Sequence, residues 1–298
     1  MDVLTIHKLK NNFGSIVVLC DLDLSVSEHS IFGFIGKNGA GKTTTMKAIL
    51  GLLKPDSGAI YVMGEKVRFG QTDTNRHIGY LPDVPEFYSY MTPFEYLTLC
   101  GEVGGMNKSD IVTRSKELLE LVGLGQENRR IKGFSRGMKQ RLGIAQALLN
   151  RPKLLICDEP TSALDPAGRR EILDILLAVR KQTTVFFSTH ILSDVEHICT
   201  EAAFLDNGKI AMQGIITELR NKRSSDGFIV KTAQKEDAEM LIKAFDDFRR
   251  TEQNALVFHG SEERLFAVMH YIAENRISVQ RIERMEPTLE SLFLEVTK

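Results

Sequence analysis

The alternation of apolar and polar positions predicts strands in the first part of the chain and then a helix. Apolar runs at Ile16–Leu19 and Ile31–Ile35 stand between polar turns, as strands do. After Lys42 the apolar positions follow an i, i+3, i+4, i+7 spacing, which predicts one buried face of a helix that the turn at 55–58 ends. The residues on that face are Met46, Ile49, Leu50 and Leu53.

Strands and helices alternate in the next part of the chain. The helical spacing recurs at Met138–Leu149 and Ile172–Val179, and short apolar runs predict strands at Leu154–Cys157 and Thr184–Phe187. Apolar strands that alternate with helices predict an α/β fold with a mostly parallel sheet. Asn207-Gly208, between two further apolar runs, predicts a hairpin turn.

A polar, unpatterned stretch at 221–227 predicts a linker to a small second domain. Strands and helices alternate again beyond it, which predicts a compact α+β domain over 228–298. The expected elements are strands at Phe228–Lys231, Ala255–His259 and near Ile277–Ile282, and helices around 238–245, 265–272 and 289–296.

Composition and charge argue against several classes of protein. The chain has 298 residues with 38 Lys+Arg against 39 Asp+Glu, so its formal net charge of −1 offers no basic footprint for nucleic acid. No apolar run approaches the ~18 residues of a membrane-spanning helix, and the first 30 residues show no signal peptide. The four cysteines lie far apart without a CxxC pair, which argues against a disulfide framework or a zinc site and fits a reducing cytoplasm.

The segment from Gly36 to Thr43 carries the first candidate chemistry. It fits the pattern G-x-x-x-x-G-K-[ST] without a mismatch, after a predicted strand and before a predicted helix. Its glycines let successive N–H groups turn toward an anion, and the helix adds its positive dipole end. We expect Lys42 to reach the β- and γ-phosphates of a nucleotide, and the Thr43 hydroxyl to hold Mg²⁺. The alternative is a glycine-rich turn that matches by chance.

Two adjacent acids carry the second candidate chemistry. The apolar strand that begins at Leu154 ends in Asp158 and Glu159, and a buried strand has no reason to end in paired acids unless a cation or a reaction needs them. We expect Asp158 to serve Mg²⁺ and Glu159 to be a general base that polarises the attacking water. A pair of solvated loop acids is the alternative, and the phosphate loop argues for the catalytic interpretation.

Three further segments resemble the motifs of ATP-binding cassette (ABC) ATPases. Phe134–Arg141 is similar to their signature motif, Ser162–Asp165 to their D-loop and Ser188–His190 to the loop of their switch histidine. The order of the motifs matches the family, and the resemblance covers about residues 1–220. It implies a P-loop NTPase cassette with a mostly parallel sheet, an antiparallel β subdomain and a helical subdomain at about 84–150, ahead of the linker and the small domain.

The resemblance also implies a nucleotide, a metal and a second cassette. Family members bind ATP with Mg²⁺, and the signature of one cassette contacts the γ-phosphate held by another, so that two cassettes enclose two ATP molecules head to tail. The simplest partner is a second copy of this chain. Phe13 is expected to stack on adenine, unless it is a core aromatic, and His190 to contact the γ-phosphate and orient Glu159. The expected residues are Glu159 and His190 for catalysis; Phe13, Gly36, Asn38, Gly39, Ala40, Gly41, Lys42, Thr43, Thr44, Ser135 and Gly137 for the nucleotide; and Thr43, Asp158 and Asp83 for the metal.

Two positions depart from the family pattern. Asp83 stands where the family has its Q-loop glutamine, and Arg136 stands where the signature most often has glycine. An ionised aspartate only accepts hydrogen bonds, so we expect Asp83 to face Mg²⁺ through a bridging water; the alternative is that it caps the turn after Pro82. Arg136 fits the start of a surface helix, and either contacts phosphate or is solvated.

An aromatic segment suggests what the ATPase drives. Five aromatic residues fall within Phe87–Tyr96, where family members engage their membrane subunits, and aromatic residues are enriched at interface cores. The alternative is ordinary packing inside the helical subdomain. We therefore expect an integral membrane permease to dock near this segment, and no nucleic-acid partner.

The expected function is that of the ATPase subunit of a membrane transporter, at the cytoplasmic face of the cell membrane. Export is favoured because Met285–Glu295 resembles the end of cassettes in bacterial exporters of drugs, bacteriocins and polysaccharides. One alternative is a soluble cassette that acts on nucleic acid, which would usually carry a coiled-coil insertion or two cassettes. Another is an importer subunit or a regulator of a membrane complex.

Overall fold

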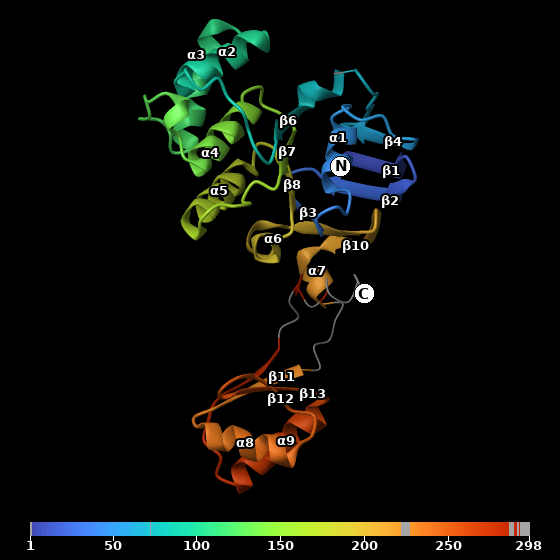
Figure 1. Ribbon diagram of the computed structural model, residues 1–298, viewed down its shortest axis with the longest axis vertical. Coiled ribbons are helices and arrows are strands. Elements are labelled where there is room, and N and C mark those ends of the chain that lie inside the picture. Colours follow the sequence, from blue (N-terminus) through green and yellow to red (C-terminus); the bar gives the residue numbers. More distant parts are fainter. Residues whose placement is uncertain (1, 72, 222–226, 286–288, 291, 293–298) are drawn as a thin grey trace. The chain divides into compact units, whose positions relative to one another are not determined.

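The computed structural model describes residues 2–71, 73–221, 227–285, 289, 290 and 292. They form two compact units (Figure 1): the first ends at Thr217, and the second runs from Glu218 to Leu292. The stretch predicted to be a linker begins shortly after this boundary, and most of it lies outside the described residues. None of the described helices is long and apolar enough to cross a bilayer.

A six-stranded sheet forms the centre of the first unit. Neighbouring strands are parallel except β9 and β10, which form the hairpin predicted at Asn207-Gly208. Every residue of β3, β7 and β8 is buried, which explains why these strands are continuous apolar runs. The mostly parallel sheet is thereby confirmed. Its strands, in spatial order, are β10 (Lys209–Ile215), β9 (Glu201–Asp206), β3 (Ile31–Gly36), β8 (Thr184–Thr189), β7 (Leu154–Asp158) and β6 (Ile78–Leu81).

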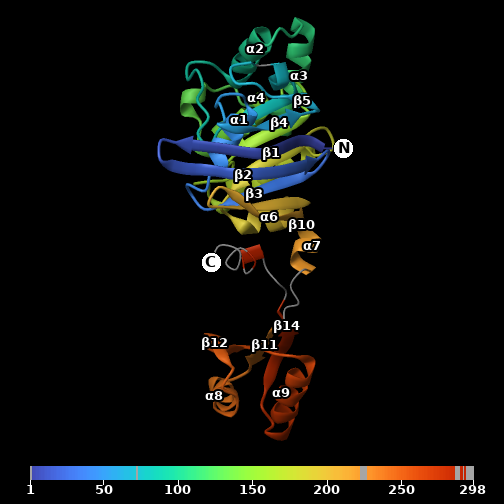
Figure 2. The same ribbon diagram turned by 90° about the vertical axis from the view of Figure 1, so that its right-hand side faces the viewer.

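A second, antiparallel sheet packs on the same core. Figure 2 shows its two long strands, β1 and β2, side by side. Leu4 and Ile6 from this sheet share one apolar cluster with Phe32 and Phe34 of the central sheet and with Met46 of the first helix. The expected antiparallel β subdomain is therefore present. Its strands, in spatial order, are β2 (Ile16–Ser27), β1 (Asp2–Phe13), β4 (Ser57–Val62) and β5 (Glu65–Lys66).

Side chains cap the starts of α2, α4 and α5 in the first unit. Thr92 and Glu95 form a capping box at the start of α2, and Asp165 caps α5 by accepting from the N–H of Gly168. In both views α2 and α3 lie together, away from β9 and β10. The helices are α1 (Lys42–Ile49), α2 (Pro93–Val103), α3 (Lys108–Leu121), α4 (Arg136–Ala147), α5 (Pro166–Val179) and α6 (Leu192–Ile198), with short 3₁₀ turns η1 (Asp73–His77) and η2 (Ile131–Gly133). A further helix, α7 (Ile216–Asn221), begins in the first unit and ends in the second.

The predicted extent of the first helix was wrong at its end. The apolar spacing predicted a helix reaching Leu53, but α1 ends at Ile49. The chain leaves the helix at Gly51, which has a φ of 69° and no room for a side chain, because a Cβ there would lie 3.0 Å from the carbonyl oxygen of Arg68. A glycine in the left-handed region is a common helix terminator, and it overrides the continuing apolar spacing.

The second unit is an antiparallel four-stranded sheet with both helices on one face, as Figures 1 and 2 both show. Phe228, Phe258 and Leu241 lie in its core. The expected strands and the first two of the three expected helices are confirmed, but β12 was missed because all its residues are exposed and none is apolar. Of the helix predicted over 289–296, only 289, 290 and 292 are described. The spatial order is β12 (Arg249–Glu252), β13 (Ala255–His259), β11 (Gly227–Thr232) and β14 (Val279–Arg284), with α8 (Lys235–Ala244) and α9 (Glu262–Glu274).

Candidate active site

The loop between β3 and α1 has the conformation of an anion site. Gly39 and Gly41 take φ angles of 83° and 110°, which residues with a side chain adopt only under strain. Gly41 directly precedes α1, and a Cβ there would lie 2.8 Å from Cδ2 of Leu19. No side chain caps α1, so its first backbone N–H groups are available to an anion.

Lys42, the first residue of α1, has a buried ammonium group. Only 6 % of its side chain is exposed, and its Nζ donates to the backbone oxygen of Gly36 at 2.7 Å. The same Nζ lies 3.1 Å from Oε1 of Glu159, which follows β7. A buried charge requires a partner, and this ion pair neutralises two charges at once.

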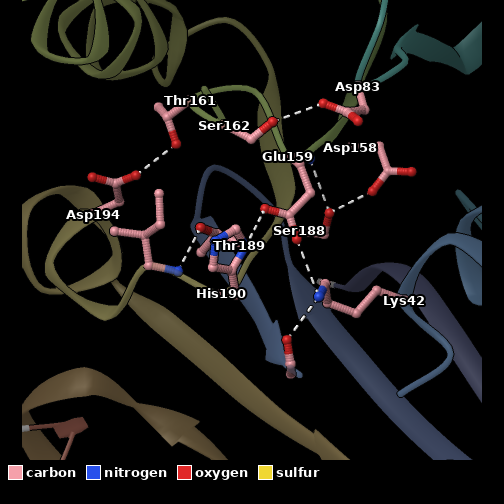
Figure 3. Close-up of polar contacts among 12 residues, drawn as sticks. Lys42, Asp83, Asp158, Glu159, Thr161, Ser162, Ser188, Thr189, His190 and Asp194 are labelled. Atoms are coloured by element: carbon pink, nitrogen blue, oxygen red, sulfur yellow. Dashed lines mark hydrogen bonds and ion pairs between the residues drawn. The ribbon is translucent and has the colours of Figure 1, made fainter. Parts of the chain in front are cut away.

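Glu159 lies between Lys42 and His190, as Figure 3 shows. Its second oxygen, Oε2, is 2.9 Å from Nδ1 of His190, the residue directly after β8. The carboxylate is 14 % exposed, and its backbone takes a φ of 48°, a conformation that is rare outside glycine and frequent at functional sites. A carboxylate held by a second group is the arrangement expected of a general base.

Asp158, the last residue of β7, joins the phosphate loop to β8. Its Oδ2 accepts from Oγ1 of Thr43 at 2.9 Å, and its Oδ1 accepts from Oγ of Ser188 at 2.6 Å. Ser188 Oγ in turn accepts from the N–H of Glu159 at 3.0 Å. Thr43 and Asp158 thus place a hydroxyl and a carboxylate together, which are the oxygen ligands that Mg²⁺ prefers, so the residues fit this metal. The described residues contain no cluster of three or more His, Cys, Asp and Glu side chains that could hold a metal by themselves.

Two neighbours of this site have raised pKa values and so stay neutral at physiological pH. Burial, together with the nearby carboxylate of Asp158, raises the pKa of Tyr80 to about 12. The same two causes raise the pKa of the Cys157 thiol, which is fully buried in β7. Neither group adds a charge of its own to the site.

A cleft of about 410 Å³ runs over these residues. Six residues that were expected at the nucleotide or in catalysis do not line it: Phe13, Gly36, Ala40, Ser135, Gly137 and His190. Phe13 ends β1 with 52 % of its surface exposed, so it is not a core aromatic. The cleft is lined by Val18, Lys37, Asn38, Gly39, Gly41, Lys42, Thr43, Thr44, Asp83, Asp158 and Glu159.

The signature segment presents an open surface at the start of α4. Ser135 is the N-cap residue, and its Oγ accepts from the N–H of Met138 at 3.2 Å. A Cβ on Gly137 would meet nothing closer than a side-chain carbon of Leu164 at 4.0 Å. The start of this helix could therefore receive an anion from outside the chain.

Asp83 and Arg136, the two departures from the family pattern, contact each other. Oδ1 of Asp83 accepts from Oγ of Ser162 at 2.8 Å and lies 3.3 Å from Nη2 of Arg136. Arg136 is therefore paired rather than merely solvated. Asp83 borders the cleft, and Figure 3 shows the hydrogen bond that its carboxylate accepts from Ser162.

Two features of the site were not predicted. The hydroxyl of Ser188 bridges Asp158 and Glu159, although the sequence analysis assigned it no role. Behind His190, the buried carboxylate of Asp194 accepts from Oγ1 of Thr161 at 2.6 Å and from Nε of Arg169 at 2.5 Å. No local pattern could have identified these contacts, because each joins residues 25 or more positions apart.

A loop that turns its amides and a lysine toward an anion, opposite a carboxylate that can activate water, is built for the hydrolysis of a nucleoside triphosphate. The first unit is accordingly a P-loop NTPase cassette. Residues 19–162 match the model of the ABC transporter family. The chain belongs to the ATP-binding proteins of ABC transporters, and it is an ATPase of that family.

Relatives of known sequence match nearly the whole chain. An uncharacterized ABC transporter ATP-binding protein of Bacillus subtilis, YxlF, is 36 % identical over 99 % of both chains. The bacitracin transport ATP-binding protein BcrA of Bacillus licheniformis is 35 % identical over 97 % of this chain and 95 % of its own.

Solved structures match the cassette. An ATP-binding subunit of an ABC transporter is 32 % identical and superposes with a TM-score of 0.66 over 74 % of this chain and 92 % of its own. Clostridium perfringens cbiO1, part of the ABC transporter complex cbiONQ, is 25 % identical with a TM-score of 0.69, over 73 % of this chain and 90 % of its own.

Proposed function

We propose that this ATPase cleaves ATP to ADP and phosphate with Glu159 as the general base and His190 as the group that orients it. The observation that carries the proposal is the contact of one carboxylate with Lys42 on one side and His190 on the other. Lys42 would exchange this contact for the β- and γ-phosphates, leaving Glu159 to take a proton from the attacking water. Phosphate release by the purified chain tests the proposal, and no release at saturating ATP and Mg²⁺ would reject it.

We further propose that Thr43 and Asp158 hold Mg²⁺, with Asp83 contributing through a bridging water. When bound, this ion neutralises charge that develops on the phosphates. The 2.9 Å hydrogen bond between Thr43 and Asp158 supports the pair, since both groups already lie within reach of one cation. Asp83 lines the same cleft, and water-bridged carboxylates are common around Mg²⁺.

Replacing Asp83 by Ala tests its share in the metal site. We expect the Mg²⁺ concentration for half-maximal ATPase to rise by no more than about tenfold, an energy change of roughly 1.4 kcal/mol, because the contact runs through water. Asp158→Ala, which removes a direct carboxylate ligand, should raise it much further. The measurement is ATPase rate against Mg²⁺ concentration at fixed ATP. An unchanged curve for Asp83→Ala removes this residue from the metal site.

We also propose that the chain works as a head-to-tail dimer of two copies. Ser135 and Gly137 are expected to contact nucleotide, yet neither lines the chain's own cleft. The open helix start at these residues is a surface that the γ-phosphate held by a second cassette could occupy. Each chain would then supply half of each site.

The partner that we propose for this dimer is an integral membrane permease, which holds the chain at the cytoplasmic face of the membrane. Tyr88 and Tyr90 are 56 % and 61 % exposed, whereas Tyr96 is buried and donates to Gln146, so the aromatic segment serves both packing and an exposed surface. Beside these tyrosines, a pocket of about 440 Å³ includes Phe87 and Ile131 in its lining. The lining combines apolar residues with charged ones such as Glu86 and Lys139. Exposed aromatic rings next to a pocket of mixed character are suited to receive an amphipathic helix of another protein.

We propose export as the direction of transport. The match to BcrA, a bacitracin transport protein, over nearly the full length of both chains supports a role in transport, and the direction rests on the resemblance of Met285–Glu295 to the end of exporter cassettes. Most of the segment 285–295, whose resemblance favoured export, lies outside the described residues. We also propose that the chain has three parts: a cassette over 1–220, a linker at 221–227 and a small α+β domain over 228–298.

Replacing Tyr88 and Tyr90 by Ser tests the docking surface. We expect association with the permease to weaken by about tenfold or more, because exposed tyrosines are frequent anchors of interfaces. ATP binding by the isolated chain should be unchanged, since both rings lie outside the cleft. Val103→Ser, at an apolar residue that is 82 % exposed at the end of α2, is the matched control. Unchanged association would refute docking at these tyrosines.

A further inference from the structure

The two positions at which the chain departs from its family form one contact with a third residue. Asp83 follows β6, Arg136 begins α4, and Ser162 lies in the turn between β7 and α5. Nη2 of Arg136 lies 3.3 Å from both Oδ1 of Asp83 and Oγ of Ser162, and Ser162 donates to the same Oδ1 at 2.8 Å. Three separate segments therefore meet at one carboxylate oxygen.

Ser162 lies in the turn that begins at Glu159, the proposed general base. The N–H of Ser162 donates to the backbone oxygen of Glu159 at 3.1 Å. Glu159 and Ala163, on either side of Ser162, have φ angles of 48° and 53°. Residues with side chains hold such angles only where surrounding contacts determine them. The hydrogen bond from Ser162 to Asp83 is a contact of this kind.

Asp83, the hydrogen-bond acceptor in this contact, is itself held in place by α4. The backbone oxygen of Asp83 accepts from Nε2 of Gln140 at 2.7 Å, and the side chain of Gln140 is fully buried in α4. Asp83 is thus held to α4 through its backbone by Gln140 and through its side chain by Arg136. Asp83 therefore offers Ser162 a hydrogen-bond acceptor whose position is set by α4 and not by the turn that carries Ser162.

Stability alone does not explain this contact. The side chains of Arg136 and Asp83 are 44 % and 47 % exposed, and exposed ion pairs contribute little to folding. The contact instead fixes the position of the Glu159 turn relative to the start of α4, where Ser135 is the N-cap residue.

We propose that Arg136 and Asp83 are positioning residues for hydrolysis, which hold the Ser162 turn and thereby the carboxylate of Glu159. The inference rests on the proposed role of Glu159 as the base. Because the contact uses Oδ1 of Asp83, Oδ2 can still face a bridging water in the cleft. The proposal also explains why the two departures from the family pattern occur together: the carboxylate of Asp83 is the partner of the guanidinium of Arg136.

The test is a double-mutant cycle of Asp83→Ala, Arg136→Ala and the double variant. Rates are measured at saturating Mg²⁺, so that any effect of Asp83 on metal affinity is removed. We expect each single variant to lower kcat by about tenfold, with KM and the affinity for a fluorescent ATP analogue changed by no more than about twofold. The double variant should be no slower than the slower single variant, because both changes act through the carboxylate of Asp83: one removes it and the other removes the group that holds it.

The outcomes separate this inference from its alternatives. If the two losses multiply to about a hundredfold, Arg136 and Asp83 act independently, for example on the phosphate of a second cassette and on the metal, and the inference is overturned. Unchanged kcat in either single variant also overturns it. If the unaltered chain releases no phosphate, the proposed function itself fails, which is a distinguishable result.

A matched control is provided by the ion pair of Lys10 and Asp21. Its side chains are both 46 % exposed and its atoms lie 3.1 Å apart, yet it joins strands of the antiparallel sheet away from the cleft. Lys10→Ala should leave kcat unaltered. Melting temperatures of all variants within a few degrees of one another would show that positioning, and not unfolding, lowers the rate.

Discussion

Replacing Glu159 by Gln is expected to lower kcat by about 10²–10⁴, the usual cost of losing a positioned base, and to leave ATP binding intact. Glutamine has nearly the same size and can keep a hydrogen bond to His190, but it cannot accept a proton from water. It also carries no charge, so Lys42 loses the ion pair that it makes at 3.1 Å and becomes free for the phosphates. Affinity for ATP should therefore be equal or slightly higher.

The measurement combines phosphate release with equilibrium binding of a fluorescent ATP analogue. Slow hydrolysis should also let the ATP-bound dimer accumulate, which size-exclusion chromatography with ATP would detect. Glu171→Gln is a suitable control, because this carboxylate is 56 % exposed on α5 and pairs with Arg141 away from the cleft. Turnover that stays at the level of the unaltered chain would rule out Glu159 as the base.

The sequence predicted those parts of the site that depend on consecutive residues. The phosphate loop is a single segment whose glycines supply the positive φ angles that it needs between a strand and a helix, so Lys42 and Thr43 could be placed from the pattern alone. Asp158 and Glu159 were identified because charge at the end of a buried strand is costly without a partner. Parallel strands then bring their carboxyl ends to one edge, which unites both segments.

Contacts between distant segments could not be predicted from such patterns. Asp83 and Arg136 are 53 positions apart, and each was interpreted separately, as a ligand of metal and as a surface residue. Their contact depends on how closely α4 packs on β6, where a Cβ on Gly143 would lie 2.5 Å from Cδ1 of Leu81. The same limit applies to Ser188, whose role follows from β8 lying next to β7.

The end of α1 and the strand β12 differ from the expected fold, and each difference has a local cause. Leu50 and Leu53 continue the apolar face of α1, but the conformation available to Gly51 ended the helix first. In the second unit β12 has the composition of a solvated loop and becomes a strand only because β13 offers it hydrogen bonds. Apolar periodicity therefore located buried elements well and edge elements poorly.

The head-to-tail arrangement predicts that two inactive variants restore activity when they are mixed. Lys42→Ala should abolish nucleotide binding, because it removes the buried cation that faces the triphosphate. Ser135→Asp should abolish hydrolysis, because it places a negative charge where the γ-phosphate of a second cassette is expected. Aspartate is as good an N-cap as serine, so the hydrogen bond to Met138 that starts α4 can persist and the fold should be retained.

A mixed dimer of these two variants contains one site with both residues intact and one site with neither. Half of the sites in a mixed dimer are intact, so isolated mixed dimers should recover about half of the activity of the unaltered chain if the sites act independently. Each variant alone has both sites impaired and should stay near background. The experiment uses two affinity tags, so that mixed dimers are isolated before phosphate release is measured. If isolated mixed dimers remain as inactive as the parents, Ser135 does not act across the interface, because the chain that keeps Lys42 would then be impaired by the charge in its own signature segment.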